Sequence, residues 1–329
     1  MTTTFKALVT IQNNDGTFKN GVQERTIDEL PDDDLLVRVE YSSLNYKDAL
    51  SASGIKGVTN QYPHTPGIDA AGIVEESNNN DLPSGTSVIV TGFDLGMNTS
   101  GGFSEYIRVP SKWAIRCPIN LTTKQAMMIG TAGLTSGLSI TEINERLKIK
   151  DANIIISGAT GGVGSIAVKL CSLLGAKVTA ITGKMREKDF LLDLGASEVI
   201  ERNEFINETR LPLNKGIYDA AIDAVGGDIL SCIIASMSYN GIIATCGNAG
   251  GPKFETTVFP FILRGNRLIG IDSAGCPINH RENVWKHFAS DWRLGGLDKM
   301  CKTVDLNGII PEIDKILKGK QTGRILLEL

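Results

Sequence analysis

The chain has 329 residues, of which 42% are hydrophobic and 21% are charged, which is enough for two globular domains with sizeable cores. Its net charge of −4 argues against a general nucleic-acid binder but allows a small basic pocket for a phosphorylated ligand. No apolar run is long enough to span a membrane, and the start lacks the pattern of a signal peptide, so we expect a cytoplasmic protein.

The first 120 residues or so predict strands separated by polar turns, arranged as a compact, partly open β-barrel. Residues 31–34 form a polar turn and residues 62–67 a rigid loop. One short helical piece is expected at 49–53. The expected strands are 5–11, 35–41, 68–74, 87–90 and 103–109.

From Thr122 onward, helices and strands alternate. Residues 122–125 resemble a capping box before a helix at 126–144, which Gly130, Gly133 and Gly137 interrupt. The following helices are expected at 165–174, 187–194, 229–236, 281–300 and 312–317. The strands are expected at 153–157, 177–181, 198–200, 218–223, 241–246, 267–271 and 324–329. This order predicts an α/β protein with a doubly wound parallel-sheet domain at 122–272, inserted into a discontinuous β-rich domain at 1–121 and 273–329.

The segment 153–182 has the strand, glycine turn, helix, strand order of a dinucleotide-binding unit. The strict G-x-G-x-x-G pattern is broken because Ala159 takes its first place, although Gly158, Gly161 and Gly164 are evenly spaced. A purely structural loop is the alternative, but the flanking strand and helix favour a nucleotide site. Its expected contacts are Thr160, Gly161, Gly162, Val163 and Gly164.

The second strand of this unit predicts NADP rather than NAD. An NAD site places an acidic residue at the end of that strand to hold the ribose diol. Here the strand continues into Thr182, Gly183 and Lys184, which offer a hydroxyl, a backbone N–H and an ammonium group to a 2′-phosphate. Arg202, after the next strand, is a second candidate cation, and ordinary solvated surface is the alternative for both charges.

The six cysteines are scattered and form no C-x-x-C pair, so neither a disulfide framework nor a zinc knuckle is indicated. We expect free thiols in a reducing compartment.

Several motifs together resemble the medium-chain dehydrogenases/reductases, and within them the zinc-free branch of quinone oxidoreductases and acryloyl-CoA reductases. The resemblance covers nearly the whole chain and rests on segments 43–48, 66–72, 130–133, 158–164, 223–227 and 259–265. It implies a GroES-like barrel domain plus a Rossmann domain, with the cofactor in the cleft between them.

Departures from the zinc alcohol dehydrogenases predict a protein without metal. Ile68 and Asp69 stand where those enzymes carry the zinc-binding His and a following Glu, and the four-cysteine zinc lobe is missing. The three histidines have no partner at ligand spacing. Without a Lewis acid, reduction of an already polarised C=C bond or quinone is favoured over alcohol oxidation.

Four residues from two barrel loops are the candidates for catalysis. The resemblance places Tyr46 against the cofactor, and Asn45, Asp48 and Asp69 come from the same two loops. The alternative is that Tyr46 is a core aromatic and the two aspartates cap local turns. If Asp48 and Asp69 lie close together, repulsion would raise the pKa of one of them by roughly two units.

Further contacts with the cofactor are expected from other loops. The family pattern returns Arg324 to the cofactor, and residues 130–133 are expected near its nicotinamide side. Segment 259–264 is also expected in a subunit contact, with sheet-edge packing as the alternative. The candidate residues are Thr131, Gly247, Phe261, Ser273 and Arg324.

The sequence thus predicts an NADPH-dependent reductase of an activated C=C bond or a quinone, acting as a homodimer on a small molecule. A small 2-enoyl-CoA such as acryloyl-CoA is favoured, and a quinone is the alternative. A non-catalytic NADPH-binding protein, like the lens crystallins of this superfamily, is a second hypothesis, and a zinc alcohol dehydrogenase is a third. Consumption of NADPH with quinones and enones would separate the first two hypotheses.

Overall fold

The computed structural model describes residues 3–329 and divides the chain into two compact units. The first unit runs to Thr131 and resumes with Ala274–Leu329, and the second is Ala132–Ser273. The first division therefore falls inside helix α2 (Thr123–Asn144), later than the boundary after residue 121 that we expected. None of the helices in residues 3–329 has the length and apolar character needed to cross a bilayer.

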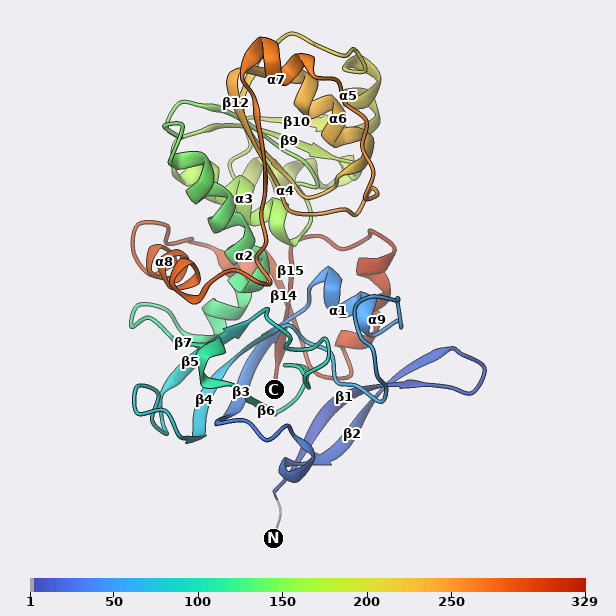
Figure 1. Cartoon of the computed structure of the whole chain (residues 1–329), viewed down its shortest axis with the longest axis vertical. Coiled ribbons are helices and arrows are strands. Elements are labelled where there is room, and N and C mark those ends of the chain that lie inside the picture. The colour runs from blue at the N-terminus through green and yellow to red at the C-terminus, as the bar shows by residue number, and fades with distance from the viewer. Residues whose placement is uncertain (1–2) are drawn as a thin grey trace. The chain divides into compact units, whose positions relative to one another are not determined.

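The first unit contains a two-stranded hairpin and a seven-stranded sheet (Figure 1). The hairpin pairs β1 (Thr4–Gln12) with β2 (Phe18–Thr26). The large sheet has the order β14-β15-β3-β4-β5-β7, and β6 also pairs with β3. Its strands are β3 (Leu35–Ser43), β4 (Asp69–Ser77), β5 (Ser87–Thr91), β6 (Tyr106–Val109), β7 (Ala114–Arg116), β14 (Cys301–Val304) and β15 (Arg324–Glu328).

The C-terminal segment completes the sheet that the N-terminal half begins. In Figure 1, the red strand β15 lies beside the blue β3, with which it pairs antiparallel. The closing strand predicted at 324–329 is confirmed by this pairing. The helices of the unit are α1 (Tyr46–Ser51), α8 (Ile278–Phe288) and α9 (Ile309–Leu317), with short 3₁₀ turns η1 (Ile27–Glu29), η2 (Ser111–Trp113) and η4 (Leu297–Lys299).

The predicted helix 281–300 was too long, because α8 ends at Phe288. Trp292 lies in the turn that follows and stacks on His287, with ring centroids 4.5 Å apart. Further along, Gly296, with φ of 71°, takes a left-handed conformation that a helix running to residue 300 could not contain. Strand β2 was also missed, because its residues are largely polar and half exposed and show no strict alternation.

A buried arginine joins the returning chain to the barrel strands. Arg281 of α8 is fully buried and donates to the carbonyl oxygens of Thr91 and Ala274, each at 2.6 Å. Its guanidinium group lies 4.2 Å from the centroid of the Phe93 ring, which stacks on Trp113. These contacts hold the start of the segment after Ser273 against the end of β5.

The second unit is a six-stranded parallel sheet with the order β10-β9-β8-β11-β12-β13. Numbered within the unit, this is the order 3-2-1-4-5-6 of the dinucleotide-binding fold, which reverses direction between β8 and β11. The strands are β8 (Asn153–Ile156), β9 (Lys177–Thr182), β10 (Glu198–Glu201), β11 (Tyr218–Asp223), β12 (Met237–Thr245) and β13 (Arg267–Gly270). The helices are the remainder of α2, α3 (Gly162–Leu173), η3 (Met185–Glu187), α4 (Lys188–Asp193), α5 (Arg202–Glu208), α6 (Gly227–Ser236) and α7 (Phe259–Arg264).

The core of this unit forms around the apolar middle residues of its central strands. Ile154, Ile155 and Ile156 of β8 are all fully buried, as a strand covered on both faces requires. One face packs against side chains of α5, α6 and α7. The doubly wound parallel sheet predicted from the sequence is therefore present, with the carboxyl ends of its strands at one edge.

Candidate functional site

The glycine turn after β8 has the geometry of a phosphate-binding loop. Helix α3 starts at Gly162, and its first N–H groups have no acceptor within the helix, so they favour an anion at this end. Gly158 has φ of 59°, and a Cβ on Gly164 would lie 2.3 Å from the carbonyl oxygen of Gly158. Only glycine fits at position 164, so the departure at Ala159 leaves the close helix–strand packing intact.

Strands β9 and β10 pair in parallel, with Thr182 opposite Glu201 at their carboxyl ends. Each end is followed by a cation, Lys184 after β9 and Arg202 after β10. The guanidinium carbon of Arg202 lies 3.3 Å from where a Cβ of Gly183 would stand. The hydroxyl of Thr182 accepts the N–H of Lys184 at 3.0 Å. Glu201 caps its own helix by accepting hydrogen bonds from the N–H groups of residues 203 and 204.

The remaining candidates of the second unit have mixed surroundings. Gly247 follows β12, and a Cβ there would lie 2.3 Å from the carbonyl oxygen of Ala224, so two loop backbones touch at this point. Phe261 is partly buried against the sheet core, which corresponds to the packing alternative. Ser273 accepts a hydrogen bond from the hydroxyl of Thr135 at 2.8 Å.

In the first unit, four of the predicted site residues, Asp69, Asn45, Thr131 and Arg324, meet around one buried carboxylate, together with Ser43. Asp69 is fully buried, and its two oxygens accept both the N–H and the hydroxyl of Thr131, at 2.9 and 2.5 Å. Ser43 donates to it at 2.5 Å and the amide of Asn45 at 2.8 Å. The guanidinium group of Arg324 lies 4.0 Å away as its ionic partner. A buried carboxylate needs hydrogen-bond or ionic partners, and four residues supply them to Asp69.

This network surrounds a break in helix α2. Gly130 has φ of 56° and ψ of −162°, so the helical hydrogen bonding is interrupted there. Arg324 donates to the carbonyl oxygen of Met128 at 3.2 Å, and Asp69 accepts a hydrogen bond from the N–H of Thr131. A Cβ at position 130 would lie within 2.6 Å of both charged side chains. The ion pair therefore supplies the partners that the broken helix cannot.

Arg324 is a buried hydrogen-bond donor within the first unit. Its side chain is only 3% exposed and donates to Met128, to Leu44 at 3.2 Å and to Ser43 at 2.8 Å. These bonds direct the guanidinium group at the protein, so a direct contact with the cofactor stays a prediction without support from its environment. The sequence showed Arg324 directly after Gly323 but gave no sign that Asp69 is its buried partner.

The amide of Asn45 is fully occupied. Its nitrogen donates to the carbonyl oxygen of Ser43 and to Asp69, and its oxygen accepts from Arg324 at 3.3 Å. Both amide hydrogens are thus used, and none is left for a substrate oxygen. Asn45 holds the loop before α1 in place, and these contacts argue against a catalytic role for its amide.

Asp48 lies one turn into α1 and is also fully buried. Its carboxylate accepts the N–H groups of Asn45 and Ile68, each at 2.7 Å, so it caps the helix and joins the two loops. Burial raises the pKa of Asp48 to about 7, and the nearby charge of Asp69 adds to this rise. The pKa of Asp48 is thus raised, with burial as the largest cause and the repulsion that we expected as a smaller one.

Tyr46 is the first residue of α1, and its side chain is 40% exposed. A core aromatic would be buried, so the structure excludes that alternative. Tyr46 lies between Asn45 and Asp48 in the chain, which the network holds in place, and its exposed side chain is accessible to a ligand.

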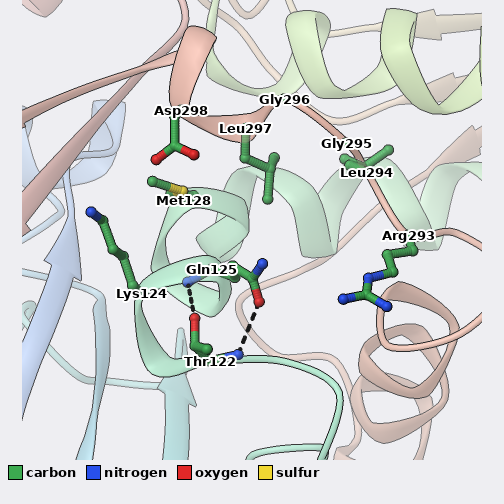
Figure 2. Close-up of a pocket in the computed structure, with 10 residues that line it drawn as sticks. All are labelled: Thr122, Lys124, Gln125, Met128, Arg293, Leu294, Gly295, Gly296, Leu297 and Asp298. Atoms are coloured by element: carbon green, nitrogen blue, oxygen red, sulfur yellow. Dashed lines mark hydrogen bonds between the residues drawn. The ribbon is translucent and has the colours of Figure 1, made fainter.

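A separate cavity of about 580 Å³ lies between the start of α2 and residues 293–298. Figure 2 shows Lys124 and Arg293 on opposite sides of it. The predicted capping box is confirmed at its floor, where Thr122 and Gln125 exchange hydrogen bonds of 3.1 Å. None of the predicted catalytic or cofactor residues lines this cavity.

Within residues 3–329, no three His, Cys, Asp or Glu side chains are arranged to hold a metal ion. The six cysteines are unpaired thiols, as expected. Independence from metal remains a prediction about the purified protein.

Family models match both parts of the chain. The alcohol dehydrogenase GroES-like domain matches residues 31–119, and the zinc-binding dehydrogenase model matches residues 162–290. The putative quinone oxidoreductase YhfP of Bacillus subtilis is 39% identical, with all of both chains covered. The chain belongs to the medium-chain dehydrogenase/reductase family.

Other members of this medium-chain family are equally similar. The acrylyl-CoA reductase AcuI of Ruegeria pomeroyi is 37% identical over 99% of both chains. The yhdH oxidoreductase of Salmonella enterica, solved with NADP, is 36% identical, with a TM-score of 0.95 over 98% of this chain and 99% of that one. B. subtilis yhfP was solved with NAD, at 38% identity and a TM-score of 0.95 over 99% and 100% of the two chains.

Membership of the family confirms the fold that the motifs predicted, a GroES-like domain with a Rossmann domain. It does not assign the site residues, whose environments come from the contacts described above. Ser43 was missed as a site residue, although it opens the 43–48 motif, because a serine gives no sign of a distant buried carboxylate.

We expect the pH dependence of stability to report the buried carboxyl group of Asp48. Its pKa of about 7 lies above the ordinary 3.8, so between these values the folded state keeps a proton that the unfolded chain has lost. The free energy of unfolding should therefore fall as pH rises from about 4 to 7, by up to roughly 1.4 kcal/mol per unit relative to Asp48→Asn. Urea unfolding at several pH values measures this difference.

Asp32→Asn removes an exposed carboxylate and is the control, whose pH profile should stay parallel to that of the wild type. Parallel profiles for the wild type and Asp48→Asn would contradict the raised pKa.

Proposed function

We propose that this protein is an NADPH-dependent reductase of an activated C=C bond or a quinone, with small 2-enoyl-CoA thioesters as the favoured substrates. The observation that carries the cofactor preference is the cluster of Thr182, Lys184 and Arg202 at the ends of β9 and β10. The relatives named as acrylyl-CoA reductase and quinone oxidoreductase support the reaction class.

The preference for NADPH follows from the charge that this cluster must meet. A 2′-phosphate carries negative charge and accepts hydrogen bonds, whereas a ribose diol requires an acceptor such as a carboxylate. Glu201, the acidic residue directly before Arg202, accepts hydrogen bonds from the first N–H groups of its own helix. A related structure contains NAD, so both cofactors belong in the test.

The chain's own residues suggest how the reaction is supported. When bound, NADPH supplies a hydride to the electrophilic carbon of the substrate. The conjugated oxygen then gains negative charge and needs a hydrogen-bond donor. Because the amide of Asn45 is occupied, we propose the hydroxyl of Tyr46, a backbone N–H or a ribose hydroxyl for this role.

The proton in this proposal comes from solvent water. Asp48 is fully buried beneath the loop backbone and has no exposed face from which to pass a proton to a substrate. Asp69 is surrounded by donors on both oxygens, so we assign it a positioning role rather than a catalytic one.

The second unit carries a surface that fits a second copy of this chain, and we propose a homodimer. Val258, Phe259, Ile262 and Leu263 are between 45% and 70% exposed and lie at or beside α7. Among the described residues, the adjacent strand β13 has no partner on its outer edge. An apolar patch beside a free strand edge favours self-association through both elements.

Lys184→Ala should weaken NADPH binding by roughly ten- to a hundredfold, because one charged phosphate contact is lost. Binding of NADH should change little, since it lacks the 2′-phosphate. Fluorescence titration of both cofactors against both proteins gives the four dissociation constants. Lys318→Ala removes the same charge from an exposed site in the other unit and should leave all values unchanged. Equal affinity of the wild type for NADH and NADPH would refute the preference.

Acryloyl-CoA should be reduced with a higher kcat/KM than benzoquinone, and both should consume NADPH. Tyr46→Phe should lower kcat for acryloyl-CoA by about tenfold, or about 1.4 kcal/mol of barrier, if its hydroxyl meets the developing charge. Stopped-flow and steady-state assays measure these values. Turnover of quinones alone would contradict the thioester assignment but keep the reductase class. Binding of NADPH without turnover of either substrate would favour the non-catalytic hypothesis.

Ile262→Asp should convert the homodimer to monomer, because it places a charge in the centre of the apolar patch. Sedimentation velocity at micromolar concentration measures the mass. Ile119→Asp, at a side chain that is fully exposed in the other unit, is the matched control and should remain dimeric. A wild type that sediments as a monomer would sink the proposal.

A further inference from the structure

A second buried carboxylate lies at the point where the parallel sheet reverses its order. Asp223 ends β11 and is fully buried. It accepts the hydroxyl of Ser157 at 2.6 Å, the hydroxyl of Thr245 at 3.1 Å and the N–H of Gly226 at 3.0 Å. Ser157 directly follows β8 and Thr245 ends β12, so one side chain joins the carboxyl ends of three neighbouring strands.

The same carboxylate determines the path of two glycine loops. Gly226 and Gly227 have φ of 71° and 59°, conformations that favour glycine. A Cβ on either would lie 2.7 Å from a carbonyl oxygen of the loop after β12, at Gly251 and Gly250 respectively. Gly250 also donates to Val225 at 2.7 Å. The two loops therefore pack as one unit, and Asp223 holds its base.

These loops lie on the side of the sheet that receives the second half of a dinucleotide. The cation cluster at β9 and β10 takes the 2′-phosphate, and thus the adenosine half, at the ends of the first three strands. A dinucleotide crosses the switch point, so its other half lies at the ends of the second three strands. Those ends carry the loops that follow Asp223 and Thr245.

We propose that Asp223 is a positioning residue for the nicotinamide half of NADPH. The inference rests on the proposed cofactor. Asp223 acts on that cofactor through the two glycine loops and not by direct contact. A carboxylate is needed because it accepts on both oxygens, whereas an amide would turn an N–H toward the N–H of Gly226 or leave Ser157 without an acceptor. Hydroxyl groups can rotate to adapt, but the backbone N–H of Gly226 cannot.

The test compares whole and half cofactors. Asp223→Asn should weaken NADPH binding about tenfold or more, while its affinity for 2′,5′-ADP, which has only the adenosine half, stays within about twofold. Lys184→Ala is the matched control and should weaken both ligands. Isothermal titration gives the dissociation constants, and thermal unfolding without ligand records any general loss of stability.

The outcomes separate positioning from a purely structural role. Equal weakening of NADPH and 2′,5′-ADP by Asp223→Asn, or no weakening of either, would overturn the inference. If Asp223→Asn does not fold, Thr245→Val removes one donor and should still weaken NADPH more than 2′,5′-ADP, and an unchanged ratio would overturn it. Failure of the wild type to bind either ligand would instead contradict the proposed cofactor.

Discussion

The ion pair between Asp69 and Arg324 is the interaction on which the first unit's site depends. Burying two charges costs several kcal/mol of desolvation, and the cost is offset only where hydrogen bonds satisfy both partners. Here Asp69 accepts from three side chains and one backbone N–H, and Arg324 donates to two carbonyl groups. Removing either partner alone would leave an unpaired buried charge beside a broken helix.

The break at Gly130 lies beside the pair. A helix interruption leaves backbone carbonyl and N–H groups without their helical partners, and such groups need other partners when they are buried. Arg324 can only donate and Asp69 can accept on both oxygens, so the pair matches these two needs. Because the same two side chains hold Asn45, the loop that presents Tyr46 is fixed by the same contacts.

The two buried aspartates of this unit show how environment separates equal side chains. Asp69 is surrounded by side-chain donors and a cation, whereas Asp48 has two backbone N–H groups and the charge of Asp69 nearby. Burial therefore raises the pKa of Asp48 to about 7. Both carboxyl groups are fully buried, so these two aspartates hold the loops in place and do not contact a ligand directly.

The sequence by itself determined the fold class, the alternation of strands and helices along the chain and the glycine turn at 158–164, because apolar periodicity and glycine spacing are local properties. It also identified Thr182, Lys184 and Arg202 together, since they follow neighbouring parallel strands. Only the tertiary structure decided the roles of Asn45, Asp69 and Arg324. Their partners are distant in the chain, and whether a polar group is free or occupied depends on contacts that no local pattern contains.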